Sequence, residues 1–226
     1  MKNKKEIFDA KTINKILGVN DSFRAADKMM SLLSDEGSRL FIFNRFLQIE
    51  NKLDDDWFRK YFETEQAERK KKKQDFTPKS VITVLNQLMG NNGSSYYEPC
   101  AGTGGILIGK WYNNLVNDPV GMEILRRKGI APTLSILTYT PRNYWYVAEE
   151  KSDRAFPFLL FNMAIRGMNG VAIQCDSLTR QAKRAYFVRN DTDNALAFSE
   201  IFELPKNGMV AKELNISEWV DDFDLD

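Results

Sequence analysis

The chain has 226 residues, of which 43% are hydrophobic and 12% aromatic, and its formal net charge is +1. This composition predicts a packed core rather than a disordered chain. The near-neutral charge argues against a general nucleic-acid-binding surface, so any DNA contact must come from local patches. No run of about 18 apolar residues and no apolar signal core is present, so we expect a protein of the cytoplasm that does not enter a membrane.

The residue types that are missing restrict the chemistry. There is no histidine, which excludes imidazole-based catalysis and histidine metal sites. The only two cysteines are Cys100 and Cys175, which favours buried reduced thiols over a disulfide framework or a zinc site.

Residues 1–73 predict a helical N-terminal domain. An Asp21-Ser22 cap precedes the first apolar helical face, and Asp35 to Ser38 should separate it from the second. Core packing is the expected role of the apolar residues, with a partner surface as the alternative. The three faces contain Ala25, Met29, Leu32 and Leu33; then Leu40, Phe43, Phe46 and Leu47; then Trp57, Phe58, Tyr61 and Phe62.

The highest local density of positive charge ends this region. Such a run can contact DNA phosphates, and a solvated helix end beside nearby glutamates is the equally open alternative. The residues are Arg69, Lys70, Lys71, Lys72 and Lys73.

The segment from Ser94 to Lys110 organises the remaining α/β part, residues 74–226. It reads as a short aromatic strand ending at Glu98, a glycine-rich turn, and an apolar helix start at Ile106. Glycine accepts positive φ and has no Cβ, so such a turn lets the backbone approach a nucleotide-like ligand.

The residues of this turn discriminate among cofactors. A dinucleotide fingerprint needs glycine where Leu107 stands, and a phosphate loop needs Ser or Thr where Trp111 stands. The pattern from Glu98 to Gly105 instead resembles the S-adenosylmethionine loop of adenine-specific DNA methyltransferases, with an ordinary strand-to-helix turn as the alternative. The resemblance implies cofactor contacts from Glu98, Pro99, Ala101, Gly102, Thr103 and Gly104.

A second segment, before the loop, supports the same family. An amphipathic helix is predicted to begin in the segment Gln74-Asp75-Phe76-Thr77-Pro78, with Thr77 as its cap. The free backbone amides at the start of this helix favour a carboxylate ligand. It resembles the Gln-Phe-Phe-Thr-Pro signature of type I restriction-modification methylation subunits. The resemblance implies that Phe76 and Thr77 contact the methionine end of the cofactor.

Two further acidic residues follow in the order that the family shows. Strand Tyr144 to Ala148 ends in Glu149-Glu150, and the resemblance makes Glu150 the ligand of the ribose hydroxyls, while Glu149 should face the other side of the strand. The strand beginning at Gly170 ends in Asp176-Ser177, which resembles the element beside the cofactor's adenine. Residues 112–143 between these elements predict an irregular insertion with one short helix.

The catalytic element of the family is not found. An Asn-Pro-Pro-aromatic motif should follow the fourth strand, where it would accept hydrogen bonds from a flipped adenine. Asn190, after the strand-like segment Ala185 to Val188, occupies roughly that position, and an ordinary Asn-Asp turn is the alternative. An acidic tail ends the sequence.

We therefore expect an α/β fold: a truncated, doubly wound, mainly parallel Rossmann-like sheet of an S-adenosylmethionine-dependent methyltransferase, preceded by a helical domain. The resemblance implies the cofactor-binding half of an N6-adenine DNA methyltransferase of the restriction-modification type, truncated or degenerate, with a specificity subunit or another protein as partner. The alternative is a catalytically silent regulator or decoy, encoded by a phage or mobile element, that binds protein or DNA.

Overall fold

The computed structural model describes residues 7–64, 77–89, 93–130 and 138–223. A six-stranded sheet has the order β1-β2-β3-β4-β5, with β6 pairing to β4. Strands β1, β2 and β3 are parallel, as is the pair β4 and β6. The α/β prediction with a mostly parallel sheet is confirmed. The strands are β1 (Ser95–Glu98), β2 (Trp145–Glu149), β3 (Gly170–Cys175), β4 (Gln181–Arg189), β5 (Glu200–Glu203) and β6 (Glu218–Trp219).

The fourth strand departs from the expected parallel arrangement, because β4 is antiparallel to β3. Only residues 176–180 connect the two strands, in a turn in which the amide of Arg180 donates to the carbonyl of Asp176 at 2.8 Å. A parallel crossover needs a dozen or more residues, so a connection this short joins antiparallel neighbours.

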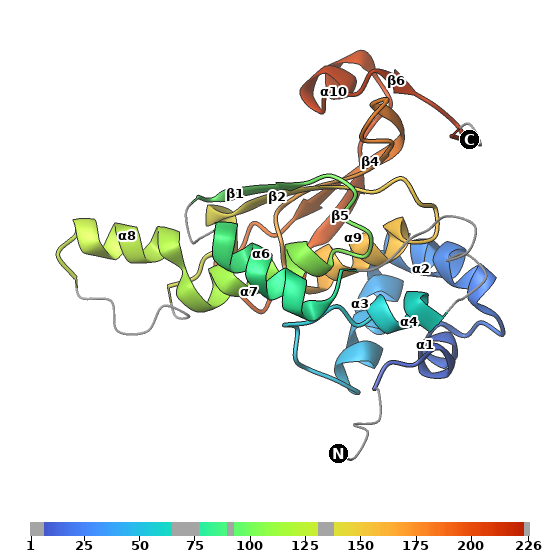
Figure 1. Ribbon diagram of the computed structural model, residues 1–226, viewed down its shortest axis with the longest axis horizontal. Coiled ribbons are helices and arrows are strands. Elements are labelled where there is room, and N and C mark those ends of the chain that lie inside the picture. Colours follow the sequence, from blue (N-terminus) through green and yellow to red (C-terminus); the bar gives the residue numbers. More distant parts are fainter. Residues whose placement is uncertain (1–6, 65–76, 90–92, 131–137, 224–226) are drawn as a thin grey trace.

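The helices lie mainly on one side of the sheet (Figure 1). The second helical layer that a doubly wound sheet would carry is limited, in the described residues, to α10, whose Ala211 packs against the small buried cluster that includes Val171 and Ile173. The helices are α1 (Ala10–Leu17), η1 (Ser22–Arg24), α2 (Ala25–Ser34), α3 (Glu36–Leu47), α4 (Arg59–Thr64), α6 (Lys79–Met89), α7 (Gly105–Asn117), α8 (Pro119–Arg127), η3 (Pro141–Asn143), α9 (Phe156–Ile165) and α10 (Gly208–Glu213).

Helix α9 forms the centre of the main core. All ten of its residues are buried, as expected for a helix that is apolar all round. Its Phe161 ring lies 5.0 Å from Phe43, 4.9 Å from Phe46 and 5.2 Å from Phe58 between ring centroids. The N-terminal aromatics therefore serve core packing, the first of the two roles considered. The domain boundary at residue 73 lies outside the described residues and stays a prediction.

Two segments are more helical than the sequence patterns indicate. The break expected from Asp35 to Ser38 is a single residue, because the Asp35 carboxylate accepts from the amide of Ser38 at 2.8 Å and starts α3 at once. The predicted irregular insertion contains the last turns of α7 and all of α8. Asp118, at φ 36°, separates those two helices and caps the second through the amide of Gly121.

Within the part of the chain that the structure describes, every helix is too short or too polar to cross a bilayer.

Candidate functional site

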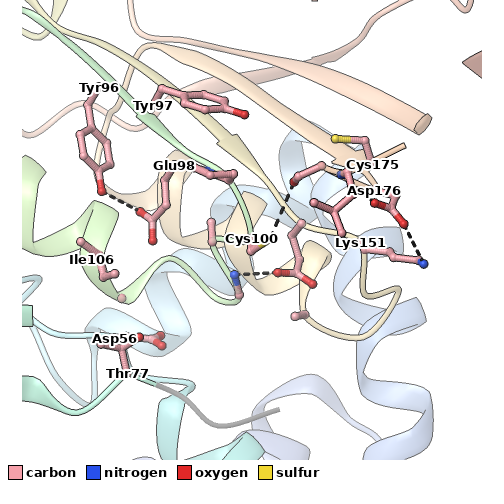
Figure 2. Close-up of a pocket in the computed structure, with 18 of the residues that line it drawn as sticks. Asp56, Thr77, Tyr96, Tyr97, Glu98, Cys100, Ile106, Lys151, Cys175 and Asp176 are labelled. Carbon is pink, nitrogen blue, oxygen red and sulfur yellow. Dashed lines mark hydrogen bonds and ion pairs between the residues drawn. The ribbon is translucent and has the colours of Figure 1, made fainter. Parts of the chain in front are cut away.

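A cavity of about 710 Å³ opens at the carboxyl ends of β1, β2 and β3 (Figure 2). It lies where ligands bind in open α/β sheets. Most of the predicted site residues line it: Thr77, Glu98, Pro99, Ala101, Gly102, Glu150, Asp176 and Ser177. Thr103 and Gly104 belong to the same turn and lie behind its wall, while Phe76 falls outside the described residues.

The turn after β1 is held in a backbone conformation that needs glycine. Gly102 has φ 61° and Gly104 has φ 92°, and a Cβ on Gly104 would lie 3.0 Å from Cδ1 of Leu159 in α9. Cys100 is also left-handed at φ 60°; it is exposed, so the expectation that both thiols are buried is wrong for this residue. Cys175 is buried and both thiols are free.

Glu150 ties the glycine turn to the end of β2. One of its carboxylate oxygens accepts from the amide of Gly102 at 2.7 Å, and the other accepts from the amide of Ser152 at 2.8 Å. The side chain is 5% exposed. Each oxygen can accept more than one hydrogen bond, so this clamp is compatible with further donors from a ligand.

Glu149 faces the other side of the sheet, as strand alternation predicts. Its carboxylate accepts from Nη1 of Arg180 at 2.6 Å and from the hydroxyl of Tyr97 at 3.0 Å. Burial opposes ionisation of Glu149, but the hydrogen bond and charge of Arg180 bring its pKa below the ordinary value. Adjacent carboxylates therefore serve opposite faces.

Glu98, the last residue of β1, is a buried acid beside the cavity. Burial, reinforced by the charge of Glu150, raises its pKa to about 7, although the Tyr96 hydroxyl donates to it at 3.2 Å. Figure 2 shows this Tyr96–Glu98 pair at the cavity wall. Near neutral pH this carboxyl is divided between its two protonation states, so a cation in the cavity would favour ionised Glu98.

Asp176 lies at the opposite wall and is ionised. Its Oδ2 contacts Nζ of Lys151 at 2.9 Å, and its Oδ1 accepts from the amides of Leu178 and Thr179. The hydrogen bond from Lys151 is the main cause of its lowered pKa. Among the described residues, the charged side chains that line the cavity are four acids, Asp56, Glu98, Glu150 and Asp176, and two bases, Arg59 and Lys151.

Asp56 is a site residue that the sequence patterns did not reveal. It is buried, and it accepts from Oγ1 of Thr103 at 2.5 Å and from Nδ2 of Asn162 at 3.0 Å. Asn162 also donates to the carbonyl of Thr103 at 2.7 Å and accepts from Nη1 of Arg166 at 2.8 Å. Burial raises the pKa of Asp56. This network attaches the N-terminal helical region to the glycine turn.

The structure does not support Asn190 as a catalytic residue. Because β4 is antiparallel, its last residues pair with the start of β3, Gly170 with Val188, so Asn190 lies at the end of the sheet away from the cavity. Its side chain donates to the carbonyls of Gly167 and Ala197 and accepts from the amide of Thr192. It serves a turn, which was the alternative.

The basic run from Arg69 to Lys73 lies outside the described residues, so its phosphate-binding role stays a prediction.

In comparisons with known proteins, the model of the N-6 DNA methylase family matches residues 56–193. No curated protein and no solved structure matches. The matched range begins at Asp56 and covers the glycine turn, Glu150 and Asp176, so it contains the network and the cavity described above.

Proposed function

Since the chain belongs to the N-6 DNA methylase family, we propose that its cavity binds S-adenosylmethionine and that the protein acts in N6-adenine DNA methylation. The main support for this proposal is that distant segments of the chain meet at one cavity. Four segments far apart in the sequence, at Thr77, Glu98 to Gly102, Glu150 and Asp176, line one cavity. Each segment resembles the cofactor-binding element of the family in the family's order.

The cavity fits this cofactor in size and charge. About 710 Å³ lies within the range of cavities that hold drug-sized ligands. S-adenosylmethionine has one carboxylate against a sulfonium and an ammonium, and this net cation is favoured by the ionised form of Glu98 at the cavity wall. Bound there, it supplies an electrophilic methyl group for an acceptor amine.

Different residues of the cavity would bind different parts of the cofactor. Glu150 is the acceptor for the ribose hydroxyls, Asp176 accepts from the adenine side, and Glu98 attracts the cationic end. Thr77 and the start of α6 favour the carboxylate, because helix N-termini bind anions.

The second candidate is a catalytically silent, methyltransferase-like regulator or decoy that binds a protein or DNA partner. The sequence contains no Asn-Pro-Pro-aromatic motif, and the position of Asn190 at the far end of the sheet favours this alternative. In the active case a partner, such as a specificity subunit, would complete the acceptor site.

Calorimetry with S-adenosylmethionine tests the cavity, using wild type, Glu98→Gln and the control Glu123→Gln on α8, outside the cavity lining. We expect micromolar binding by wild type and the control, and at least tenfold weaker binding by Glu98→Gln. An absence of binding by wild type would overturn the cavity assignment. Radiolabelled methyl transfer to adenine-containing DNA, with and without candidate partners, then separates the two functions: binding without transfer in every combination leaves the silent protein.

A further inference from the structure

Strand β1 forms one end of the sheet, and its outer edge is open (Figure 1). Within the described residues β1 pairs with β2 and with no other strand. The amide of Trp145 in β2 donates to the carbonyl of Ser94 at 2.7 Å. Because alternate residues of a parallel strand bond to the same neighbour, the amides and carbonyls of Ser95 and Tyr97 point away from β2. These backbone groups are available to a further strand.

The two ends of the sheet differ in their protection against such pairing. Native sheet edges are commonly blocked by charged side chains or proline. At the other end, β5 has two exposed glutamates, Glu200 and Glu203. The exposed side chains of β1 are Ser95 and Tyr97, which carry no charge. An edge without these blocking residues is a template for pairing with another chain.

Helix α6 is open to solvent at the same end of the sheet. Helix α7 packs on β1, and α6 packs on α7, with Ile82 against Gly105. On a side of α6 that is turned away from α7, an apolar stripe of Val81, Val84 and Leu88 is exposed, with the spacing of one helical face. A strand added beside β1 would lie over α6 and bury part of this stripe.

The strand order indicates the direction of the added strand. In doubly wound sheets of order 3-2-1-4-5-6, the first strand lies in the middle, and the ligand binds at the carboxyl ends of the strands where the order reverses. Here β3, β2 and β1 run parallel in that order, but β4 lies beside β3 instead of β1. The usual place of a parallel neighbour of β1 is therefore open, next to the cavity wall formed by Tyr96 and Glu98.

We propose that the outer edge of β1 binds a second protein, which adds one strand parallel to β1 and covers the stripe on α6 with apolar side chains. The backbone groups of Ser95 and Tyr97 select an extended strand, the mode of recognition in which main-chain hydrogen bonds provide affinity. That this strand brings the methyl acceptor site rests on the proposed function, because its carboxyl end would reach the cavity. A second copy of this chain would bring no Asn-Pro-Pro-aromatic motif.

The probe is a fluorescein-labelled peptide, Thr-Val-Thr-Val-Asn-Pro-Pro-Tyr, which joins a strand of alternating side chains to that motif. Fluorescence anisotropy measures its binding to the full chain. We expect Ser95→Pro to weaken binding by about three- to tenfold, the loss for one hydrogen bond, because proline removes an outward donor and is tolerated at the first residue of an edge strand. A peptide that is N-methylated at the alternate residues facing β1 should bind wild type more weakly by at least the same factor.

The matched control is Glu203→Pro at the other end of the sheet. The amide of Leu204 donates to the carbonyl of Ala185 at 2.9 Å, so the amide of Glu203 also points outward by strand alternation. This variant should bind the peptide as wild type does. The comparison of the two peptides on wild type needs no variant, so it decides the matter even if Ser95→Pro does not fold.

Three results would overturn the inference: no binding of the peptide by wild type, equal binding of the N-methylated peptide, or equal loss in Glu203→Pro and Ser95→Pro. A wild-type dimer that Ser95→Pro dissociates in sedimentation velocity would also overturn it, since the occupant would be a second copy. Calorimetry with S-adenosylmethionine separates the inference from the proposed function, because Ser95 does not line the cavity. Cofactor binding without peptide binding overturns the strand edge alone, whereas peptide binding without cofactor binding overturns the cofactor cavity alone.

Discussion

Glu98 makes the stability of this protein depend on pH in a direction opposite to that of an ordinary paired carboxylate. Its pKa rises from 4.5 in an unfolded chain to about 7 in the fold. Between these values the folded protein keeps a proton that the unfolded chain has released. The contribution of Glu98 to the free energy of unfolding is therefore fully present below pH 4.5 and is lost as the pH rises through 7. A shift of this size corresponds to about 3 kcal/mol, at 1.36 kcal/mol per pKa unit.

Glu98→Gln keeps the shape and removes the titration. We expect wild type to lose up to about 3 kcal/mol of stability relative to this variant between pH 4.5 and 8, which corresponds to roughly 6–12 °C in Tm for a chain of this size. Urea and thermal unfolding at several pH values measure the difference curve, in which the other titrating groups cancel. The control Glu123→Gln, on α8, should run parallel to wild type between pH 4.5 and 8, because the hydrogen bonds from Arg127 and Arg126 lower the pKa of Glu123 and keep it ionised in this range. Parallel curves for Glu98→Gln as well would refute the buried, titrating role of Glu98.

Three further variants test the architecture around the cavity. Asn162→Ala removes one hydrogen-bond partner each from the Asp56 carboxylate, the Thr103 carbonyl and the Arg166 guanidinium. Urea denaturation should therefore show a loss of about 2–3 kcal/mol or more; a loss under 1 kcal/mol would mean that the network is not needed. In Gly104→Ala, the alanine would have to adopt φ 92° and its Cβ would contact Leu159. This strain should lower the free energy of unfolding by about 1–3 kcal/mol. Gly208→Ala, where a Cβ meets nothing within 4 Å, is its control and should be nearly neutral in the same melts. Arg180→Ala removes the cation from buried Glu149 and should cost about 3 kcal/mol, a loss that should shrink at pH values low enough to protonate Glu149; a constant loss from pH 4 to 8 would contradict the pairing.

Sequence patterns predicted the cavity because its elements are local. The strand from Ser95 to Glu98, the glycine turn and the helix after it are adjacent in the chain, and strand alternation alone places Glu149 and Glu150 on opposite faces. Resemblance to a family order then put Thr77 and Asp176 at the same site, and the cavity contains both.

The sequence patterns did not predict features that depend on how distant segments of the chain are arranged in the fold. Asp56 reaches Thr103 and Asn162 only after the N-terminal helices pack on α9, and no periodicity encodes that contact. Asn190 was placed by analogy with a parallel fourth strand. The five-residue connection after Cys175 was the available signal against it, because a parallel crossover does not fit in that length.

The double role of Glu150 determines which variants can identify the cofactor site. Its carboxylate holds the amides of Gly102 and Ser152 before any ligand arrives. Glu150→Ala would therefore loosen the glycine turn as well as remove ribose contacts, and weaker binding would not distinguish these effects. Glu98 accepts hydrogen bonds from the hydroxyl of Tyr96 and from the backbone amide of Leu107. The glutamine of Glu98→Gln keeps a carbonyl oxygen that can accept from both donors, so this replacement leaves the Glu150 clamp on the glycine turn in place. If a cation binds beside it, Glu98 must release a proton, and calorimetry in buffers of different ionisation enthalpy should detect up to one proton released below pH 7. Glu98→Gln should abolish that release, and release that persists in the variant would place the titrating group elsewhere.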